Sequence, residues 1–193
     1  GFFGKFIGSR NSEIITSASV TTSAILSIVI LYEVISQDYS NNLIVASWIK
    51  SGSLDVNWSI KIDALSSIML VVVTLISSIV HIYSIGYMSH DPHKSRFMSY
   101  LSLFTFAMLT LVTSDNFLQL FFGWEGVGLC SYFLIGFWFK RDNANAAAIK
   151  AFLVNRVGDI GLALGIFLIF YLLGTVNFDE VFELIPTILN EDI

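Results

Sequence analysis

Charged residues, cysteine and proline are all scarce in this chain of 193 amino acids. Only 13% of the residues are charged, whereas an ordinary soluble domain carries about 25%. The single cysteine, Cys130, excludes an internal disulfide and any metal site built from cysteines alone. No stripe of basic residues runs along the sequence, so nucleic acid is not an expected partner. The low charge content instead indicates a membrane protein.

Hydrophobic residues make up 55% of the chain and gather in long runs. Since about 20 apolar residues cross the hydrocarbon core of a bilayer, runs of this length predict membrane-spanning helices. Five spans are predicted, at residues 14–35, 64–88, 97–113, 117–139 and 151–173. The predicted fold is therefore an all-α polytopic membrane protein, with residues 1–193 forming a single membrane domain embedded in the lipid bilayer.

Residues 43–62 interrupt this helical pattern with two short β-prone runs on either side of the polar tetrapeptide KSGS. Such a pattern predicts one short β-hairpin outside the membrane. Trp48 and Trp58 within it suit the aromatic belt that forms at membrane surfaces. The acidic tail from residue 178 onward is expected to lie along the membrane surface.

The positive charges gather on one side of the predicted membrane topology. If the five spans alternate in direction, seven cations fall on the side of the N-terminus and only Lys50 and Lys61 on the other. The seven are Lys5, Arg10, Lys94, Arg96, Lys140, Arg141 and Lys150. Because cytoplasmic or matrix loops carry an excess of Lys and Arg, the N-terminus and the loops at 89–96 and 140–150 are expected on that side.

Glu125 is a lone acid inside the span predicted at 117–139. It follows the start of the span by about nine residues, which at about 1.5 Å per residue places it about 13 Å deep. A charge at that depth costs at least a few kcal/mol and marks a functional hypothesis. Burial favours the neutral acid and a nearby cation favours the carboxylate, so Glu125 could take up and release a proton. A purely structural acid paired with a basic side chain is the alternative.

Arg156 and Asp159 lie within the span predicted at 151–173. They are three residues apart and therefore share one face of a helix. Asp159 is expected at about the same depth as Glu125, because the two spans run in opposite directions and a short loop joins them. A polar layer of Glu125, Arg156 and Asp159 is the functional interpretation, and an ion pair that only packs helices is the alternative.

His81 is the remaining titratable candidate inside a span. With an unperturbed pKa near 6.5, its imidazole could relay protons, or it could simply hydrogen-bond to a neighbouring helix. His90 and His93 flank a proline in the loop that follows and lack further ligands, so they predict no metal site. The sequence has no phosphate-binding loop, nucleophile elbow or Cys/His cluster, and we expect no cofactor bound by this chain.

Two stretches carry a specific family resemblance. The sequences GWEGVGLCSYFLIGFW and AAAIKAFLVNRVGDIG closely resemble subunit 5 of respiratory complex I, NADH:quinone oxidoreductase. The resemblance implies an antiporter-like, proton-translocating membrane subunit. It places Glu125 on the family's key membrane glutamate, Arg156 and Asp159 on its R-V-G-D pair, and His81 on a position that is commonly His. NADH, FMN, iron–sulfur clusters and quinone would be bound by partner subunits.

The family's later helices, including the lysine that partners the glutamate, are absent from this sequence. We therefore expect the N-terminal fragment of a larger subunit, or one piece of a split gene. Its partners would be the remaining C-terminal helices and the other membrane-arm subunits, in the mitochondrial inner membrane or, alternatively, a bacterial one. The large subunit of a multi-subunit sodium/proton antiporter is a second interpretation, and a purely structural membrane piece is a third.

Overall fold

The computed structural model describes residues 8–37 and 39–191 and is dominated by long helices. Lys5, which was counted in the charge pattern, lies outside these residues. The elements are α2 (Ser9–Gln37), β1 (Asn41–Ser51), β2 (Leu54–Ile62), α3 (Ala64–Tyr87), α4 (Lys94–Val112), α5 (Phe117–Ile135), α6 (Asp142–Leu173) and α7 (Phe178–Glu191). In the described part of the chain, five helices (α2 to α6) are long and apolar enough to cross a membrane. The predicted fold class, five spans with one small hairpin, is confirmed.

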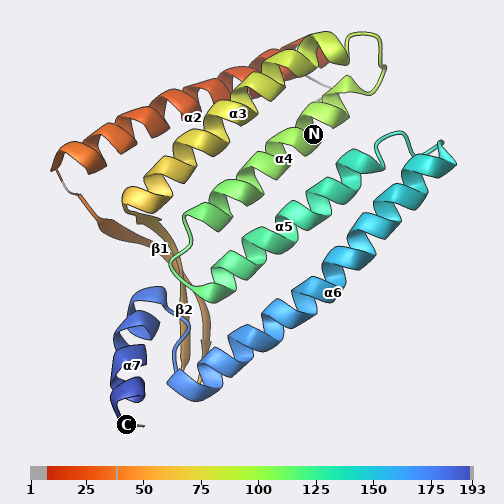
Figure 1. Ribbon diagram of the computed structural model, residues 1–193. Helices are drawn as coiled ribbons and strands as arrows, with labels where there is room; N and C mark the ends of the chain where they lie inside the picture. The colour runs from red at the N-terminus through yellow and green to blue at the C-terminus, as the bar shows by residue number, and fades with distance from the viewer. Residues whose placement is uncertain (1–7, 38, 192–193) are drawn as a thin grey trace.

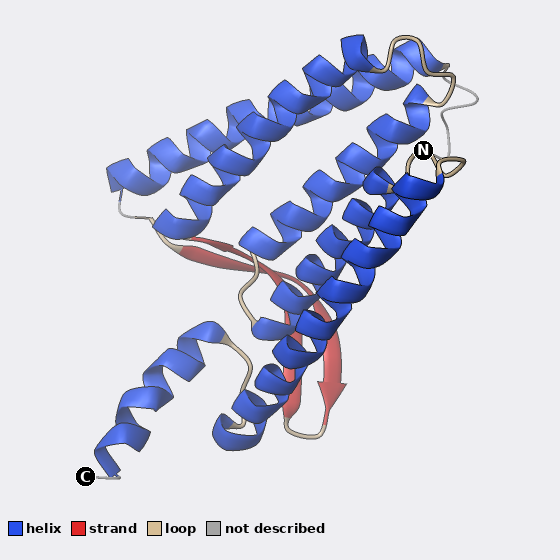
Figure 2. Ribbon diagram, turned by 45° about the vertical axis from the view of Figure 1, so that its right-hand side comes forward, coloured by secondary structure: helices blue, strands red, loops and turns tan. Residues whose placement is uncertain are grey.

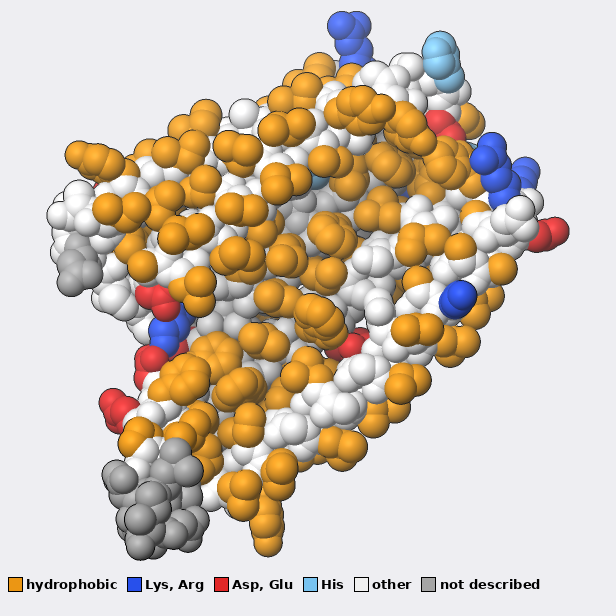
Figure 3. Space-filling model, in the orientation of Figure 1, with side chains coloured by type: hydrophobic (Ala, Val, Ile, Leu, Met, Phe, Trp, Pro, Cys, Tyr) orange, Lys and Arg blue, Asp and Glu red, His pale blue; other side chains and the backbone are white. Residues whose placement is uncertain are grey.

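The long helices lie side by side, with α4, α5 and α6 following one another across the molecule (Figure 1). The antiparallel hairpin of β1 and β2 lies across one end of these helices (Figure 2). We call this the hairpin end, and the opposite end, with the connections at 88–93 and 136–141, the loop end. On the visible face hydrophobic side chains cover the helices, while most charged ones lie toward the two ends (Figure 3).

Several helix boundaries differ from the predicted spans. Helix α2 begins at Ser9 rather than residue 14, and α4 begins at Lys94 rather than residue 97. Helix α6 begins at Asp142, so most of the predicted loop at 140–150 is helical. An acid in the first turn and a run of alanines favour helix there, although the run is too polar to have been counted as membrane span. Helix α5 ends at Ile135 rather than Phe139. Its 19 residues still extend about 28 Å, which is close to the thickness of the hydrocarbon core.

The helices pack through small and polar side chains, as expected where lipid competes for apolar contacts. Between α2 and α3, Thr21 and Ser78 share a hydrogen bond of 2.8 Å, and so do Ser27 and Thr74. Between α4 and α5, Gly123 lies so close to α4 that a Cβ there would be 2.7 Å from the Cα of Leu111. This close approach fixes α5 against α4.

The hairpin is fastened to the helices at its own end of the molecule. The side-chain amide of Gln119 in α5 hydrogen-bonds both backbone groups of Ser59, at 3.0 and 2.7 Å. Trp48 and Trp58 contact each other and the ring of Phe122 in edge-to-face geometry. These contacts anchor the start of α5, the helix that carries Glu125, to the hairpin.

Candidate functional site

Glu125 lies near the middle of the sequence of α5. Helix α5 lies between α4 and α6 (Figure 1). The glycines on either side of it face α4, since a Cβ at Gly126 would lie 2.9 Å from the Cβ of Ala107. The side chain of Glu125 is 23% exposed in the described structure. Gly123 and Gly126 thus let α5 pack closely against α4, whereas Gly128 faces α6, where a Cβ would lie 4.0 Å from Nδ2 of Asn155.

The carboxylate of Glu125 is paired with a cation from the next helix. Nη1 of Arg156 in α6 donates a hydrogen bond to Oε2 of Glu125 and forms a salt bridge with it. The two residues are 31 positions apart in the sequence, and only the antiparallel packing of α5 and α6 brings them together. Pairing satisfies both charges at a depth where an isolated one would be costly.

Asp159 supplies a second carboxylate to the same guanidinium. Its Oδ2 lies 3.9 Å from Nη1 of Arg156, and its Oδ1 accepts a hydrogen bond of 2.9 Å from the indole Nε1 of Trp124. The Asp159 side chain is only 8% exposed, whereas that of Arg156 is 42% exposed. We call Glu125, Arg156, Asp159 and Trp124 the polar cluster. Its formal charge is −1 when both acids are ionised.

The guanidinium of Arg156 also contacts an aromatic ring on its own helix. Its Cζ lies 4.7 Å from the ring centroid of Phe152, within the range of a cation–π contact. The guanidinium therefore has one face on an aromatic ring and one edge shared between two acids.

His81 lies elsewhere, at the contact between α3 and α4. It is fully buried, and its Nε2 lies 3.2 Å from Oγ of Ser102 in α4. Its Nδ1 lies 2.8 Å from the carbonyl oxygen of Ser77, whose hydroxyl is 2.5 Å from that of Thr105. These contacts join two helices, and none of them reaches the polar cluster. The geometry matches the helix-bonding alternative for His81.

Two contacts were not anticipated from the sequence. Trp124 was overlooked, although an indole N–H directly before a membrane acid is a possible donor to nearby carboxylates. The other is a pair at the loop end, where Nζ of Lys94 lies 3.0 Å from Oε1 of Glu13. Glu13 is 4% exposed. It falls just outside the span predicted at 14–35 but inside α2.

The loop histidines belong to no metal-binding group. Among residues 8–37 and 39–191, no three His, Cys, Asp or Glu side chains are grouped closely enough to hold a metal ion. Asp91 instead accepts hydrogen bonds from the backbone N–H of His93 and from Nε1 of Trp138, at 2.7 and 3.0 Å. These bonds hold the pKa of Asp91 below its usual value.

Comparisons with known proteins show which family the chain resembles. Residues 48–98 match the family model described as NADH-ubiquinone oxidoreductase (complex I) chain 5 N-terminus. Residues 114–192 match the model for the transmembrane region of NADH:quinone oxidoreductase and Mrp antiporters. Chain 5 of NADH-ubiquinone oxidoreductase from Triticum aestivum is 59% identical over 182 residues, covering 94% of this chain and 27% of the relative. NADH-quinone oxidoreductase subunit L from Rickettsia bellii is 48% identical, covering 100% of this chain and 30% of the relative.

Solved structures show the same fold at lower identity. A chain of the Mrp complex from Dietzia superposes with a TM-score of 0.70 at 21% identity, over 93% of this chain and 19% of that chain. A chain of an archaeal membrane-bound sulfane sulfur reductase superposes with a TM-score of 0.76 at 17% identity, over 93% of this chain and 36% of that chain. The present chain thus spans less than a third of the length of the two named sequence relatives.

Proposed function

The chain belongs to the family of antiporter-like membrane subunits that contains NADH-ubiquinone oxidoreductase chain 5, and we propose that it is part of the proton-translocating arm of such an oxidoreductase. Quinone reduction would take place in other subunits, which would hold NADH, FMN, the iron–sulfur clusters and quinone. This chain would contribute no redox chemistry of its own. Its partners would be the other membrane-arm subunits and the remaining helices of the same subunit.

The observation that supports this proposal most directly is the sharing of Arg156 between two acids. When Glu125 is ionised, the guanidinium binds it. When Glu125 is protonated, that attraction disappears and Arg156 would be drawn toward the carboxylate of Asp159, which is 3.9 Å away. Protonation of Glu125 thus changes the position of a charge inside the membrane.

Movement of a charge within the membrane is a means of coupling one site to the next. Because Coulomb interactions are stronger at low dielectric and are little screened by salt inside the membrane, a shift of Arg156 would alter the protonation energy of other groups along the membrane arm. Asp159 serves as the second docking point for Arg156, and the indole of Trp124 holds its carboxylate in place. The functional unit we propose is therefore the polar cluster rather than Glu125 alone. His81 remains a candidate relay between α3 and α4.

The chain is a multi-pass inner-membrane protein, as its five candidate spans and its relatives indicate. The side that each end faces follows from charge. The loop end carries five exposed or half-exposed cations in the described residues outside the spans or at their termini, namely Arg10, Lys94, Arg96, Lys140 and Arg141. The positive-inside rule then places the loop end in the mitochondrial matrix or bacterial cytoplasm. The hairpin end and α7 would face the opposite compartment.

A second candidate function is that of the large subunit of a multi-subunit sodium/proton antiporter. The match of residues 114–192 to a model shared with Mrp antiporters, and the fold of the Mrp complex, favour it. The polar cluster would serve the same purpose in both. Purification of the assembled complex distinguishes them, because only the first candidate co-purifies with subunits that reduce quinone.

The decisive experiment for the proposed function is Glu125→Gln in the complete complex. The substitution keeps the shape of the side chain but removes its proton exchange, so proton pumping and the coupled quinone reductase activity should both fall at least tenfold, about 1.4 kcal/mol or more. Glu33→Gln is the matched control, since Glu33 lies exposed near the end of α2. Full pumping by an assembled Glu125→Gln complex would remove Glu125 from the mechanism and leave the purely structural interpretation of the chain.

A further inference from the structure

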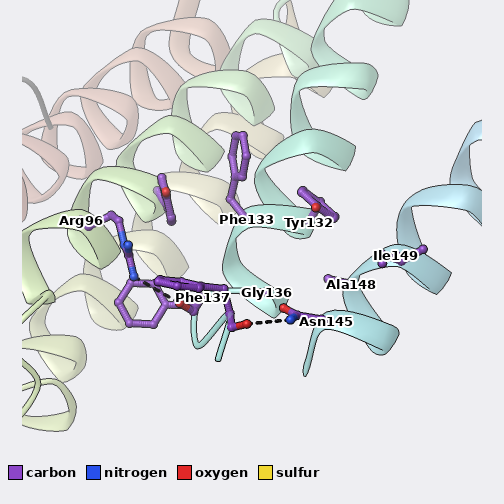
Figure 4. Close-up of a pocket in the computed structure, with 10 residues that line it drawn as sticks. Arg96, Tyr132, Phe133, Gly136, Phe137, Asn145, Ala148 and Ile149 are labelled. Carbon is purple, nitrogen blue, oxygen red and sulfur yellow. Dashed lines mark hydrogen bonds between the residues drawn. The ribbon is translucent and has the colours of Figure 1, made fainter. Parts of the chain in front are cut away.

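A cavity of about 550 Å³ opens at the loop end, away from the polar cluster (Figure 4). It lies between the start of α4, the end of α5 and the start of α6. The residues that line it are Arg96, Tyr100, Tyr132, Phe133, Gly136, Phe137, Phe139, Asn145, Ala148 and Ile149. The proposed proton chemistry uses none of them, so the cavity calls for a separate explanation.

Arg96 is the only charged residue in this lining. It sits in the first turn of α4, where its Nη2 donates to the carbonyl oxygen of Phe137 at 3.2 Å. Its guanidinium also lies over the rings of Phe137 and Phe139, with Cζ 4.8 and 5.5 Å from their centroids. Its Nε is buried and has no hydrogen-bond partner among the described residues. The guanidinium of Arg96 is therefore held in place by Phe137 and Phe139.

Three aromatic side chains, Tyr100, Tyr132 and Phe133, line the cavity about one helical turn deeper than Arg96. Tyr100 stacks on Phe133 with ring centroids 5.2 Å apart, and Tyr132 packs against Phe152 at 5.5 Å. Each tyrosine presents an apolar ring and a polar hydroxyl. Side chains of this kind are typical of the level at which lipid headgroups meet the hydrocarbon.

The charges around the cavity favour an anion. Lys140 and Arg141 follow directly after the lining residue Phe139, and both are exposed. The nearby acids are Asp91, which already accepts two hydrogen bonds, and Asp142 in the first turn of α6. Arg96, Lys140 and Arg141 outnumber the two acids, so the local net charge at the membrane boundary is positive. A phosphate group at that level binds strongly to a desolvated guanidinium.

The cavity continues onto an apolar surface. Ile149 lines it and is 51% exposed, and Leu153, one turn further along α6, is 58% exposed. A molecule with a charged head at Arg96 would find hydrocarbon contacts along this face of α6. A small soluble anion would not use them.

We propose that this cavity binds the phosphodiester headgroup of an anionic phospholipid, with Arg96 as its principal ligand. The guanidinium contacts the phosphate, the tyrosine hydroxyls accompany it at headgroup depth, and an acyl chain follows α6 past Ile149 and Leu153. Such a lipid would bridge α4, α5 and α6 at the loop end. This inference does not depend on the proposed function, since it involves no member of the polar cluster.

Photolabelling of the purified complete complex tests the proposal. The complex is placed in nanodiscs that contain a trace of phosphatidylglycerol with a photoreactive acyl chain, and the labelled peptides of this chain are quantified. Loss of one cation near a membrane surface weakens lipid binding by about 1 kcal/mol, or about fivefold, so Arg96→Gln should reduce labelling of the α6 peptide by that factor. The matched control is Arg10→Gln, which removes an exposed cation of α2 that neither lines the cavity nor adjoins a lining residue, and it should leave labelling nearly unchanged.

A second variant keeps the test decisive if Arg96→Gln fails to assemble. Ile149→Trp narrows the cavity from an exposed position and leaves Arg96 intact, so it should also reduce labelling. Equal labelling by photoreactive phosphatidylcholine would overturn the proposal, as would unchanged labelling in Arg96→Gln or in Ile149→Trp. Millimolar inorganic phosphate should not compete; abolition of labelling by phosphate would identify a site for the free anion instead.

Discussion

Arg156 reaches across from α6 to bind the carboxylate of Glu125 on α5, and this is the contact on which the polar cluster depends. It joins two helices that run in opposite directions, and it places a cation beside an acid near mid-span. Asp159, three residues further along α6, keeps a second acid 3.9 Å from the same cation. The three charges therefore respond together to any change in one of them.

Replacement of Arg156 by Gln should destabilise the assembled complex and abolish coupling. It leaves Glu125 and Asp159 as two partly buried acids without a cation. Breaking a fully buried pair costs about 3–5 kcal/mol, and the 42% exposure of Arg156 reduces this to about 2 kcal/mol. Thermal stability of the complex and proton pumping in vesicles measure the two effects.

Two further variants serve as a partial rescue and as a control for Arg156→Gln. Arg156→Lys keeps the positive charge but not the planar guanidinium with its several hydrogen-bond donors. The Lys variant should therefore retain more of the thermal stability than of the proton pumping. Arg10→Gln removes an exposed cation at the loop end and should change neither quantity. If Arg156→Gln pumped normally, the guanidinium would have no part in moving protons.

Trp124→Phe should weaken the cluster through Asp159. The phenyl ring retains most of the apolar contact but cannot donate to Oδ1 of Asp159, which then lacks a partner at 2.9 Å. A hydrogen bond to a charged group contributes about 1.5–3 kcal/mol, so a fall in thermal stability and a severalfold loss of pumping are expected. The matched control is Trp138→Phe, which removes the equivalent bond to exposed Asp91 at the loop end. A larger effect at Trp138 than at Trp124 would contradict a positioning role for Trp124.

Much of this arrangement follows from the sequence. The five spans were predictable because long apolar runs have few alternatives in a membrane, and the hairpin because β-prone runs flank a polar turn. The layer of Glu125, Arg156 and Asp159 was predictable because helix geometry fixes depth, and antiparallel neighbours bring equal depths together. The family resemblance pointed to the same three residues.

The remaining contacts could not be predicted because they depend on side-chain direction and helix rotation. Trp124 precedes Glu125, yet nothing in the sequence says that its indole reaches Asp159 on another helix. The start of α6 at Asp142 was missed because a hydropathy run locates the membrane portion of a helix and not its extension beyond the bilayer. The hydrogen bonds from Gln119 to the hairpin likewise required the packed helices to be known.

Gly123→Ala should separate α5 from α4. A Cβ at this position would lie 2.7 Å from the backbone of Leu111, a distance that no flexible side chain can relieve. Overpacking of this kind costs about 1–3 kcal/mol, and the resulting shift would also displace Glu125, two residues away. Assembly yield and thermal stability of the complex give the measurement. Gly128→Ala is the control, because its Cβ would meet only Nδ2 of Asn155 at 4.0 Å. Equal losses in both variants would indicate a helix-propensity effect rather than a packing one.

The buried pair of Glu13 and Lys94 should behave as a coupled unit that ties α2 to α4 at the loop end. Lys94→Gln removes the cation beside the carboxylate of Glu13, a residue that is only 4% exposed. We expect the complex to lose about 3 kcal/mol of stability. Glu13→Gln removes the acid instead, and leaves a lysine that can turn toward water, so it should cost less.

The double variant, Glu13→Gln with Lys94→Gln, decides whether the two residues act through each other. Neither side chain then needs a counterion, so the loss should fall well short of the sum of the single losses, with a coupling energy of about 1–3 kcal/mol. The fraction of intact complex that remains after graded heating is measured for the unchanged protein, the two single variants and the double variant. Proton pumping by the surviving complexes should be unchanged, since neither residue belongs to the polar cluster. Additive losses would mean that the 3.0 Å contact contributes nothing to holding α2 in place.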